Sequence, residues 1–343
     1  MGFLGLEDGQ LFEGRLIGSK RKAIGEIVFN TGMTGYEEIL SDPSYFGQMV
    51  LMTYPLIGNY GVNLEDMESS KPHIKALVVR ELCDFPSNWR SEQDLNSWLV
   101  KHNIPGIQGV DTRHITKIIK EKGVMNAIIS EDKPTKEDWD KVKAYKIKEP
   151  VKKVSVKKAY KIDGSGKNVA VVDLGVKRNI LNCLIERNLN LTVFPYDVEP
   201  SEILYGGFHG VVFTNGPGNP KDNKEIIENI KALIGKKPIM GICLGHQLVA
   251  LAQGADAQRL KYGHRGGNHP VKDLKSGKMH ITAQNHSYAV IAETLPKNSK
   301  VTFINWHDKT VEGVKYSNNC FTVQFYPEAN DTGYLYDEFL RMM

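Results

Sequence analysis

Residues 238–247 read Pro-Ile-Met-Gly-Ile-Cys-Leu-Gly-His-Gln, and their pattern is an apolar run that leads through two glycines into a helix. The apolar run up to Ile242 predicts a buried strand, and residues 244–253 predict a helix. The G-x-C-x-G sequence between them is the thiol version of a nucleophile elbow. Cys243 would then lie at a helix N-terminus, where the helix dipole favours the thiolate. A small apolar cysteine packed in a turn is the alternative, but the combined pattern favours a nucleophile.

The chain around this stretch alternates apolar strands with amphipathic helices. Strands are predicted at 169–173, 191–194 and 210–214, and helices at 177–188 and 222–234. Such alternation predicts right-handed crossovers and a mainly parallel sheet flanked by helices. Active sites of these sheets lie at the carboxyl ends of the strands. The loops after residues 173, 214 and 242 are therefore the ones that should carry chemistry.

A second glycine cluster follows the strand at 210–214. Residues 214–220 read Thr-Asn-Gly-Pro-Gly-Asn-Pro, and their glycines and prolines fix a loop whose backbone N–H groups can point into a site. A plain turn is the alternative. The position of the loop at a strand's carboxyl end favours a functional role.

The chain is expected to have two domains and a linker. Residues 1–130 predict a mixed α/β domain, residues 131–167 a Lys-rich linker, and residues 168–343 the α/β domain with the elbow. The linker holds 12 lysines and 7 acidic residues, an excess of five positive charges. This local excess is larger than the net charge of +4 for all 343 residues. A solvated connector explains this local excess better than a nucleic-acid surface, whose basic residues would line a face or groove.

Several function classes are excluded by the sequence. No apolar run approaches the roughly 18–20 residues of a membrane span, and the first residues do not resemble a secretory signal. The four cysteines are widely spaced with no C-x-x-C, so neither a disulfide framework nor a zinc site is expected. The chain also has no P-loop and no evident metal cluster. A cytoplasmic protein without a cofactor or metal of its own is expected, with neither nucleic acid nor membrane as a partner.

The motifs resemble those of a known family. Residues 241–247, 215–218 and 321–329 are similar to the nucleophile motif, oxyanion loop and terminal catalytic segment of class I glutamine amidotransferases. Further segments resemble the carbamoyl-phosphate synthase small-chain family in particular. These segments are residues 30–36, 42–45, 53–61, 109–113, 263–271 and 281–286.

This resemblance implies roles for individual residues. Cys243 matches the nucleophile that forms a glutamyl thioester, and Glu328 matches the acid that orients the catalytic base. Ser287 and Tyr288 stand where the family usually has Gly-Phe, so their match to substrate contacts is weaker. The other implied substrate contacts are Ser44, Gly216, Gly218, Leu244, Gln247 and Asn285.

One position departs from the family motif. Tyr326 stands where the family has its catalytic histidine. A phenol with an ordinary pKa of about 10 is a poor base near neutral pH and cannot form the cationic partner of a thiolate. Three readings remain open: a natural change that weakens the glutaminase, an introduced substitution, or replacement by another histidine. The candidates for replacement are His246, His264, His269 and His286, of which His286 flanks the substrate segment and is the best placed.

The resemblance implies a glutaminase subunit. It would hydrolyse L-glutamine and pass ammonia to a large subunit, which would bind ATP and magnesium and make carbamoyl phosphate for arginine and pyrimidine synthesis. Two alternatives remain. The first is a catalytically silent partner of the large subunit that supports ammonia-dependent synthesis. The second is a free-standing thiol hydrolase, which would leave residues 1–130 unexplained.

Overall fold

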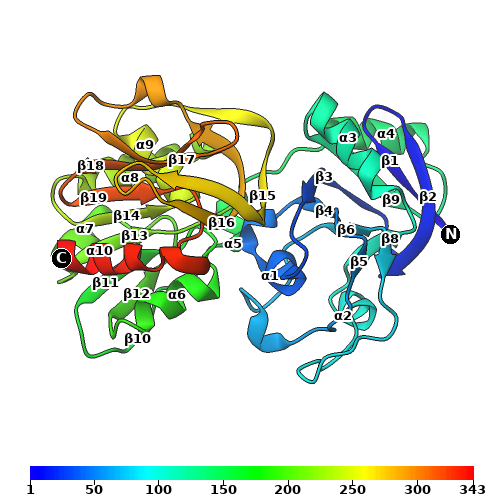
Figure 1. Cartoon of the computed structure of the whole chain (residues 1–343), viewed down its shortest axis with the longest axis horizontal. Helices are drawn as coiled ribbons and strands as arrows, with labels where there is room; N and C mark the ends of the chain where they lie inside the picture. Colours follow the sequence, from blue (N-terminus) through cyan, green and yellow to red (C-terminus); the bar gives the residue numbers. More distant parts are fainter. The chain divides into compact units, whose positions relative to one another are not determined.

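The computed structural model describes the backbone of residues 1–343 and every side chain except that of Asn330. The chain forms two compact units, Met1–Lys148 and Glu149–Met343 (Figure 1). In the part that is described, every helix is too short or too polar to span a membrane.

The first unit is built around a closed β-barrel. Its strand order is β1-β2-β8-β6-β4-β3-β9, with β3, β4, β6 and β8 parallel neighbours and the other pairs antiparallel. The barrel strands are β1 (Gly2–Leu6), β2 (Leu11–Gly18), β3 (Ala23–Asn30), β4 (Gln48–Met52), β6 (Ala76–Val79), β8 (Pro105–Gln108) and β9 (Met125–Ser130). Closure leaves the barrel no free edge that could pair with another chain.

Alternation along the barrel strands divides the first unit's core in two. Val28 and Val50 pack in a cluster with helices α1 and α2, whereas Ile27 and Met49 pack in a cluster with α3. This is the period of two that a strand imposes on its side chains. The remaining elements of this unit are α1 (Tyr36–Ser41), η1 (Pro43–Tyr45), β5 (Leu56–Ile57), η2 (Leu64–Asp66), β7 (Glu81–Leu82), α2 (Leu95–Lys101), α3 (Thr112–Lys122) and α4 (Lys136–Ala144).

The second unit contains a ten-stranded sheet in the order β10-β12-β11-β13-β14-β19-β18-β17-β15-β16. Strands β12, β11, β13, β14 and β19 are parallel neighbours, as the alternating sequence pattern predicted. Their bounds are β11 (Asn168–Val172), β12 (Asn190–Phe194), β13 (Gly210–Phe213), β14 (Ile239–Ile242) and β19 (Cys320–Val323).

Helices cover both faces of the parallel strands (Figure 1). Ala170 and Val172 pack in one cluster with α7, α8 and α9, whereas Val169 and Val171 pack in the other with α6 and α10. The nucleophile candidate, Cys243, belongs to the second cluster. The helices are α6 (Arg178–Ile185), α7 (Pro200–Tyr205), α8 (Lys224–Leu233), α9 (Leu244–Ala252) and α10 (Tyr334–Met342), with the short turns η3 (Pro220–Asp222), η4 (Ala292–Thr294) and η5 (Asn330–Thr332).

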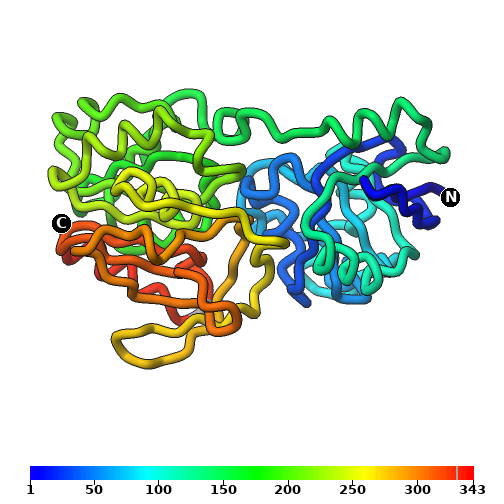
Figure 2. Tube along the Cα trace, turned by 90° about the horizontal axis from the view of Figure 1, so that it is seen from above, coloured from blue at the N-terminus to red at the C-terminus, as the bar shows by residue number. Residues whose placement is uncertain are grey.

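The sheet continues beyond β19 as an antiparallel extension that the sequence pattern did not predict. It comprises β15 (Ala257–Asp273), β16 (Met279–Val290), β17 (Lys300–Asn305) and β18 (Val311–Ser317). The long β15–β16 hairpin forms a gold loop at the margin of this unit (Figure 2). Two register shifts break its pairing, near Gly263 and Gly266, so this glycine-rich stretch is a bulged strand.

The Lys-rich stretch 131–167 also differs from the linker that was expected. It contains α4, α5 (Pro150–Val154) and β10 (Tyr160–Ile162), and β10 pairs with β12 at the edge of the sheet. Each helix has a buried apolar residue, which is Val142 in α4 and Val151 in α5. A capping box at Thr135 and Asp138 begins α4. High charge therefore marks the solvated faces of short helices rather than an absence of structure.

Candidate active site

Cys243 lies between β14 and α9, as the elbow motif predicted. Its backbone has φ 54° and ψ −102°, a conformation that L-residues rarely adopt. The backbone N–H of Cys243 donates to the carbonyl of Val323 at 2.8 Å, which holds the turn against β19. Backbone strain held in place by surrounding structure is typical of functional positions. Cys243 is buried, and its role as a nucleophile stays a prediction that this strained turn is consistent with.

The two glycines of the motif are required by close backbone approach. A Cβ on Gly245 would lie 2.1 Å from the carbonyl oxygen of Phe213, and one on Gly241 would lie 2.8 Å from the carbonyl oxygen of Gly245. The amide of Gly245 also donates to the carbonyl of Thr214 at 3.0 Å. The glycines therefore let α9 begin directly against the end of β13.

The glycine loop after β13 lies beside Leu244, the residue that follows Cys243. A Cβ on Gly216 would lie 2.9 Å from Leu244 Cδ2 and 2.2 Å from the carbonyl oxygen of Leu174. Gly218 has φ +97°, which favours glycine. Leu244 itself is buried. The structure thus brings Gly216, Leu244 and Cys243 together, as the positions of their loops at one edge of the sheet predicted.

The loop after β11 contributes Lys177, a charged residue that the sequence motifs did not indicate. Asp173 accepts hydrogen bonds from the backbone N–H groups of Val156, Gly175 and Val176, and burial raises its pKa. This turn carries the chain to Lys177, whose backbone N–H donates to Asn215 Oδ1 at 3.1 Å. The signal was available, because this loop is one of the three in which parallel-sheet topology places chemistry.

Lys177 forms an ion pair with Glu328, the residue that the resemblance assigns to orienting the base. Lys177 Nζ lies 2.8 Å from Glu328 Oε1, and the two side chains are 8% and 3% exposed. The same ammonium lies 4.2 Å from the ring centroid of Tyr326, which is within the range of a cation–π interaction. Glu328 is thus engaged by a fixed cation, and the phenol packs beneath that cation.

Tyr326 lies in the loop that follows β19. Its backbone N–H donates to the carbonyl of Ala283 at 3.0 Å, and the two residues form an isolated bridge. Because β14 and β19 are parallel neighbours with Ile242 opposite Val323, their following loops leave the sheet at the same edge. Tyr326 and Cys243 also belong to one buried cluster. The position at which the family has its histidine is therefore occupied by a buried phenol, on the loop next to that of Cys243.

The segment Asn285–Tyr288 faces the elbow through its backbone. The Sγ of Cys243 lies 3.5 Å from the carbonyl oxygen of Asn285 and donates to it. The Nε2 of Gln247 donates to the carbonyl of Tyr288 at 2.8 Å and to Gln324 Oε1 at 3.0 Å. Ser287 Oγ is in contact with the guanidinium of Arg265. Of the predicted contacts, Asn285 and Gln247 thus lie against the elbow and its helix.

Three of the four histidines named as replacements for the missing base are buried, and His269 is half-buried. His246 Nδ1 lies 2.7 Å from Thr322 Oγ1, and complete burial lowers its pKa to about 3. The Nδ1 of His286 donates to the carbonyl of Tyr288 at 2.8 Å, and burial lowers its pKa as well. His264 and His269 stand on β15 with their ring centroids 5.3 Å apart. This geometry gives no support to the hypothesis that His286 replaces the base.

Ser44 belongs to the first unit. It lies in η1, and its backbone N–H donates to Asp42 Oδ1 at 2.8 Å, so the turn is held by its own cap. Its contribution to the glutamine site stays a prediction, as do the roles assigned to the other site residues.

Comparison with known proteins places both units in known families. Residues 4–129 match the family described as the carbamoyl-phosphate synthase small chain, CPSase domain, and residues 170–341 match glutamine amidotransferase class I. A carbamoyl phosphate synthase small chain of Clostridium perfringens is 49% identical over 98% of this chain and 97% of its own length. The one from Listeria innocua is 50% identical over 98% and 95%. A pyrimidine-specific small chain of Bacillus subtilis is 47% identical over 98% and 94%.

Proposed function

Since the chain belongs to the carbamoyl-phosphate synthase small-chain family, we propose that it is the glutamine-hydrolysing subunit of such a synthase. The observation that carries this proposal is the strained Cys243 elbow in the unit that matches the class I glutamine amidotransferases. The substrate would be L-glutamine, and the products would be glutamate and ammonia.

The proposed reaction begins when Cys243 Sγ loses its proton and attacks the amide carbon of glutamine, and the amide nitrogen later needs one proton back to leave as ammonia. The C–S bond forms as the carbonyl π electrons move to oxygen, and the oxyanion then needs N–H donors. The N–H of Cys243 is used by Val323 and that of Gly245 by Thr214. The N–H of Leu244, in the first helical position, has no acceptor within the helix. We therefore assign Leu244 N–H as one oxyanion donor, with the backbone of the Gly216 loop as its neighbour.

Collapse of the tetrahedral intermediate requires a proton. The C–N bond breaks only as the amide nitrogen takes a proton and leaves as ammonia, and water must then lose a proton as it attacks the thioester. A histidine can serve both steps near neutral pH, whereas a phenol serves neither well. General acid–base help is worth about 10²–10⁴-fold. We therefore propose that Tyr326 leaves the nucleophile in place and makes both steps slow.

A second candidate function follows from the buried pair beside Tyr326. Lys177 neutralises Glu328, so the acid that would orient a base is held as a structural ion pair. On this reading the chain is a catalytically silent partner, and the synthase uses free ammonia. In either case we propose a large subunit as the partner, with ATP and magnesium bound there and carbamoyl phosphate as its product. Supply of the arginine or the pyrimidine pathway, and a cytoplasmic location, belong to the same proposal.

Reconstitution with a cognate large subunit separates these candidates. The two chains should co-elute in size-exclusion chromatography at micromolar concentration, and the complex should make carbamoyl phosphate from ammonia. Slow but measurable synthesis from glutamine, absent in a Cys243→Ala complex, supports the glutaminase. Synthesis from ammonia alone supports the silent partner. Failure of the two chains to associate overturns both.

A further inference from the structure

The antiparallel extension holds a buried cluster of ligand-type side chains outside the proposed thiol chemistry. His264 on β15 and His286 on β16 are directly opposite each other in the strand register, and Glu312 reaches them from β18. All three residues are buried, with Glu312 wholly inaccessible to solvent. One nitrogen or oxygen of each lies within 4.8 Å of the others. These residues are 22 or more positions apart, so no spacing in the sequence revealed the cluster.

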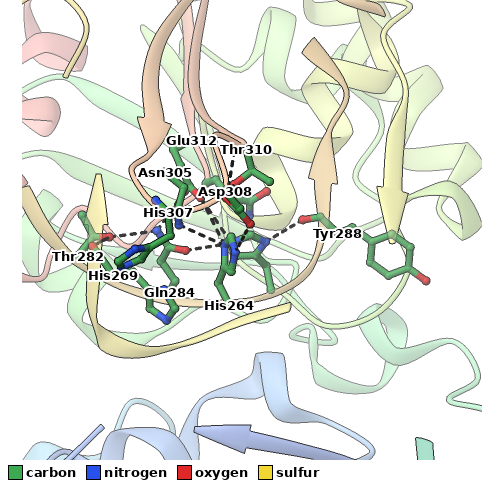
Figure 3. Close-up of polar contacts among 12 residues, drawn as sticks. His264, His269, Thr282, Gln284, Tyr288, Asn305, His307, Asp308, Thr310 and Glu312 are labelled. Carbon is green, nitrogen blue, oxygen red and sulfur yellow. Dashed lines mark hydrogen bonds and ion pairs between the residues drawn. The ribbon is translucent and has the colours of Figure 1, made fainter. Parts of the chain in front are cut away.

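In each of the two histidine rings, one nitrogen faces away from the cluster and the other faces into it. The hydrogen bond made by the outer nitrogen determines whether the inner nitrogen carries a lone pair. His264 Nε2 lies 2.8 Å from Asp308 Oδ2, and His286 Nδ1 lies 2.8 Å from the carbonyl oxygen of Tyr288. Both partners only accept hydrogen bonds, so each ring must donate there. In their neutral forms, His264 Nδ1 and His286 Nε2 therefore both carry lone pairs. Figure 3 shows the Tyr288 carbonyl turned toward the cluster and its phenol ring turned away.

The inward atoms converge on one point. His264 Nδ1 lies 3.2 Å from His286 Nε2, and Glu312 Oε1 lies 3.6 Å from the former and 3.9 Å from the latter. A point equidistant from the three atoms is about 2.1 Å from each, which follows from those three edges. Zinc binds histidine nitrogen at about 2.0–2.1 Å and carboxylate oxygen at about 2.0–2.2 Å. The triangle thus has the size that a small divalent cation requires.

A fourth acceptor completes the set. Gln284 donates through Nε2 to Thr282 Oγ1 and to Glu312 Oε2, so its Oε1 is the atom that faces His286 Nε2 at 3.1 Å. Two further side-chain donors border the space: Thr310 Oγ1 lies 3.4 Å from Glu312 Oε1, and Asn305 Nδ2 lies 3.5 Å from His264 Nδ1. Against the effect of burial, Asp308 and Glu312 raise the pKa of His264 to about 9, so in the absence of a metal its Nδ1–H is the donor that faces His286 Nε2, and a bound cation would take the place of that proton.

We propose that His264 Nδ1, His286 Nε2 and Glu312 Oε1, with Gln284 Oε1 as fourth ligand, form a binding site for a zinc-class divalent cation. The outer partners are those that metal-bound histidines use, namely a carboxylate on one ring and a backbone carbonyl on the other. The two imidazole nitrogens favour zinc, cobalt or nickel over magnesium or calcium. The ion would fasten β15, β16 and β18 together, and His286 would tie the Asn285–Tyr288 segment to it. Its role is structural, because the ligands are buried and saturate the ion.

Direct binding measurements test the site independently of glutamine hydrolysis. The full chain, freed of metal by a chelator, is dialysed against Zn²⁺, and bound metal is counted by mass spectrometry. Co²⁺ then reports ligand geometry through its visible absorption. We expect one saturable Zn²⁺ per chain and an intense tetrahedral-type Co²⁺ spectrum. Thermal unfolding should shift upward with Zn²⁺, because a ligand that binds only the folded chain stabilises it.

Matched variants locate the ion. Glu312→Gln keeps the shape of the side chain and should weaken Zn²⁺ binding at least about 100-fold, and Asp308→Asn, which removes an outer partner, should weaken it about 10–100-fold. His269→Gln changes a neighbouring ring on β15 and should leave the affinity within about threefold. If Glu312→Gln fails to fold, the Asp308→Asn result stands in its place. Absence of saturable binding, or equal affinity in all variants, would overturn the proposal and leave the cluster as a protonated hydrogen-bond chain.

Discussion

The loops after β14 and β19 leave the same edge of the sheet but differ in what they offer to catalysis. The β14 loop has a strained cysteine, two glycines that admit close backbone and a helix N-terminus. The β19 loop has a buried phenol and a carboxylate paired with Lys177. The position of a nucleophile at an elbow depends on the backbone, whereas proton transfer depends on one side chain. A substitution of that one side chain can therefore remove proton transfer and leave the elbow intact.

The largest effect is expected from removing the nucleophile itself. Cys243→Ala should abolish glutamine-dependent synthesis and leave ammonia-dependent synthesis by the complex unchanged, because ammonia bypasses the thioester. The measurement is carbamoyl phosphate formation with each nitrogen donor. Cys320→Ala, at a buried cysteine on β19, is the control and should retain glutamine use. Loss of both activities in Cys243→Ala would mean that the elbow serves assembly rather than chemistry.

The β19 loop should be the more sensitive to loss of charge. Lys177→Met leaves Glu328 buried without its cation and should lower the free energy of unfolding by about 3–5 kcal/mol. Lys231→Met removes the exposed partner of Glu228 on α8 and should cost at most about 0.5 kcal/mol. Denaturant titration of the two variants checks this difference. Equal costs would show that the buried pair contributes no more than a surface pair.

The β14 loop should be the more sensitive to added volume. Gly245→Ala places a methyl group 2.1 Å from the carbonyl oxygen of Phe213, so the backbone must move. We expect a loss of about 3 kcal/mol in unfolding free energy, at the upper part of the overpacking range. Gly267→Ala, where an added Cβ meets no atom within 4 Å, should change stability by less than about 0.5 kcal/mol. The elbow would be less tightly packed than described if both variants melt alike.

The smallest expected effect is a change in the shape of a pH profile. Burial lowers the pKa of His246 to about 3, so this ring stays neutral from pH 5 to 8, and burial also lowers the pKa of His286. Residual glutaminase activity should therefore show no histidine titration step in that range. Tyr326→His should add one near the ordinary histidine pKa of about 6.5. A step already present in the unmodified chain would point to a histidine base that remains in place.

The parallel part of the second unit was predictable because each of its signals is local. Buried strands such as 169–173 are continuous apolar runs, and the glycine spacing around Cys243 marks the turn directly. The antiparallel extension was not predictable, because Gly263 and Gly266 on β15 resemble a loop until a partner strand accommodates the bulges. Pairing over long sequence separation leaves no local pattern.

The residues of the candidate site also divide into those that local motifs predicted and those that depend on contacts distant in sequence. Cys243, Glu328 and the absence of the histidine at position 326 followed from motifs. The role of Lys177 did not, because an ion pair between residues 151 positions apart depends on which loops the sheet brings together. The cluster of His264, His286 and Glu312 was missed for the same reason, since its members come from three different strands.

The central claim is that the elbow is intact and only the proton donor is missing. The most direct test is the steady-state glutaminase rate of the complex with Tyr326 compared with that of its Tyr326→His variant, with intact-mass measurement of any glutamyl thioester. We predict that Tyr326→His raises the rate at least about 100-fold, and that any thioester seen on Cys243 of the unmodified chain disappears in the variant. Equal rates in the two proteins would contradict the claim.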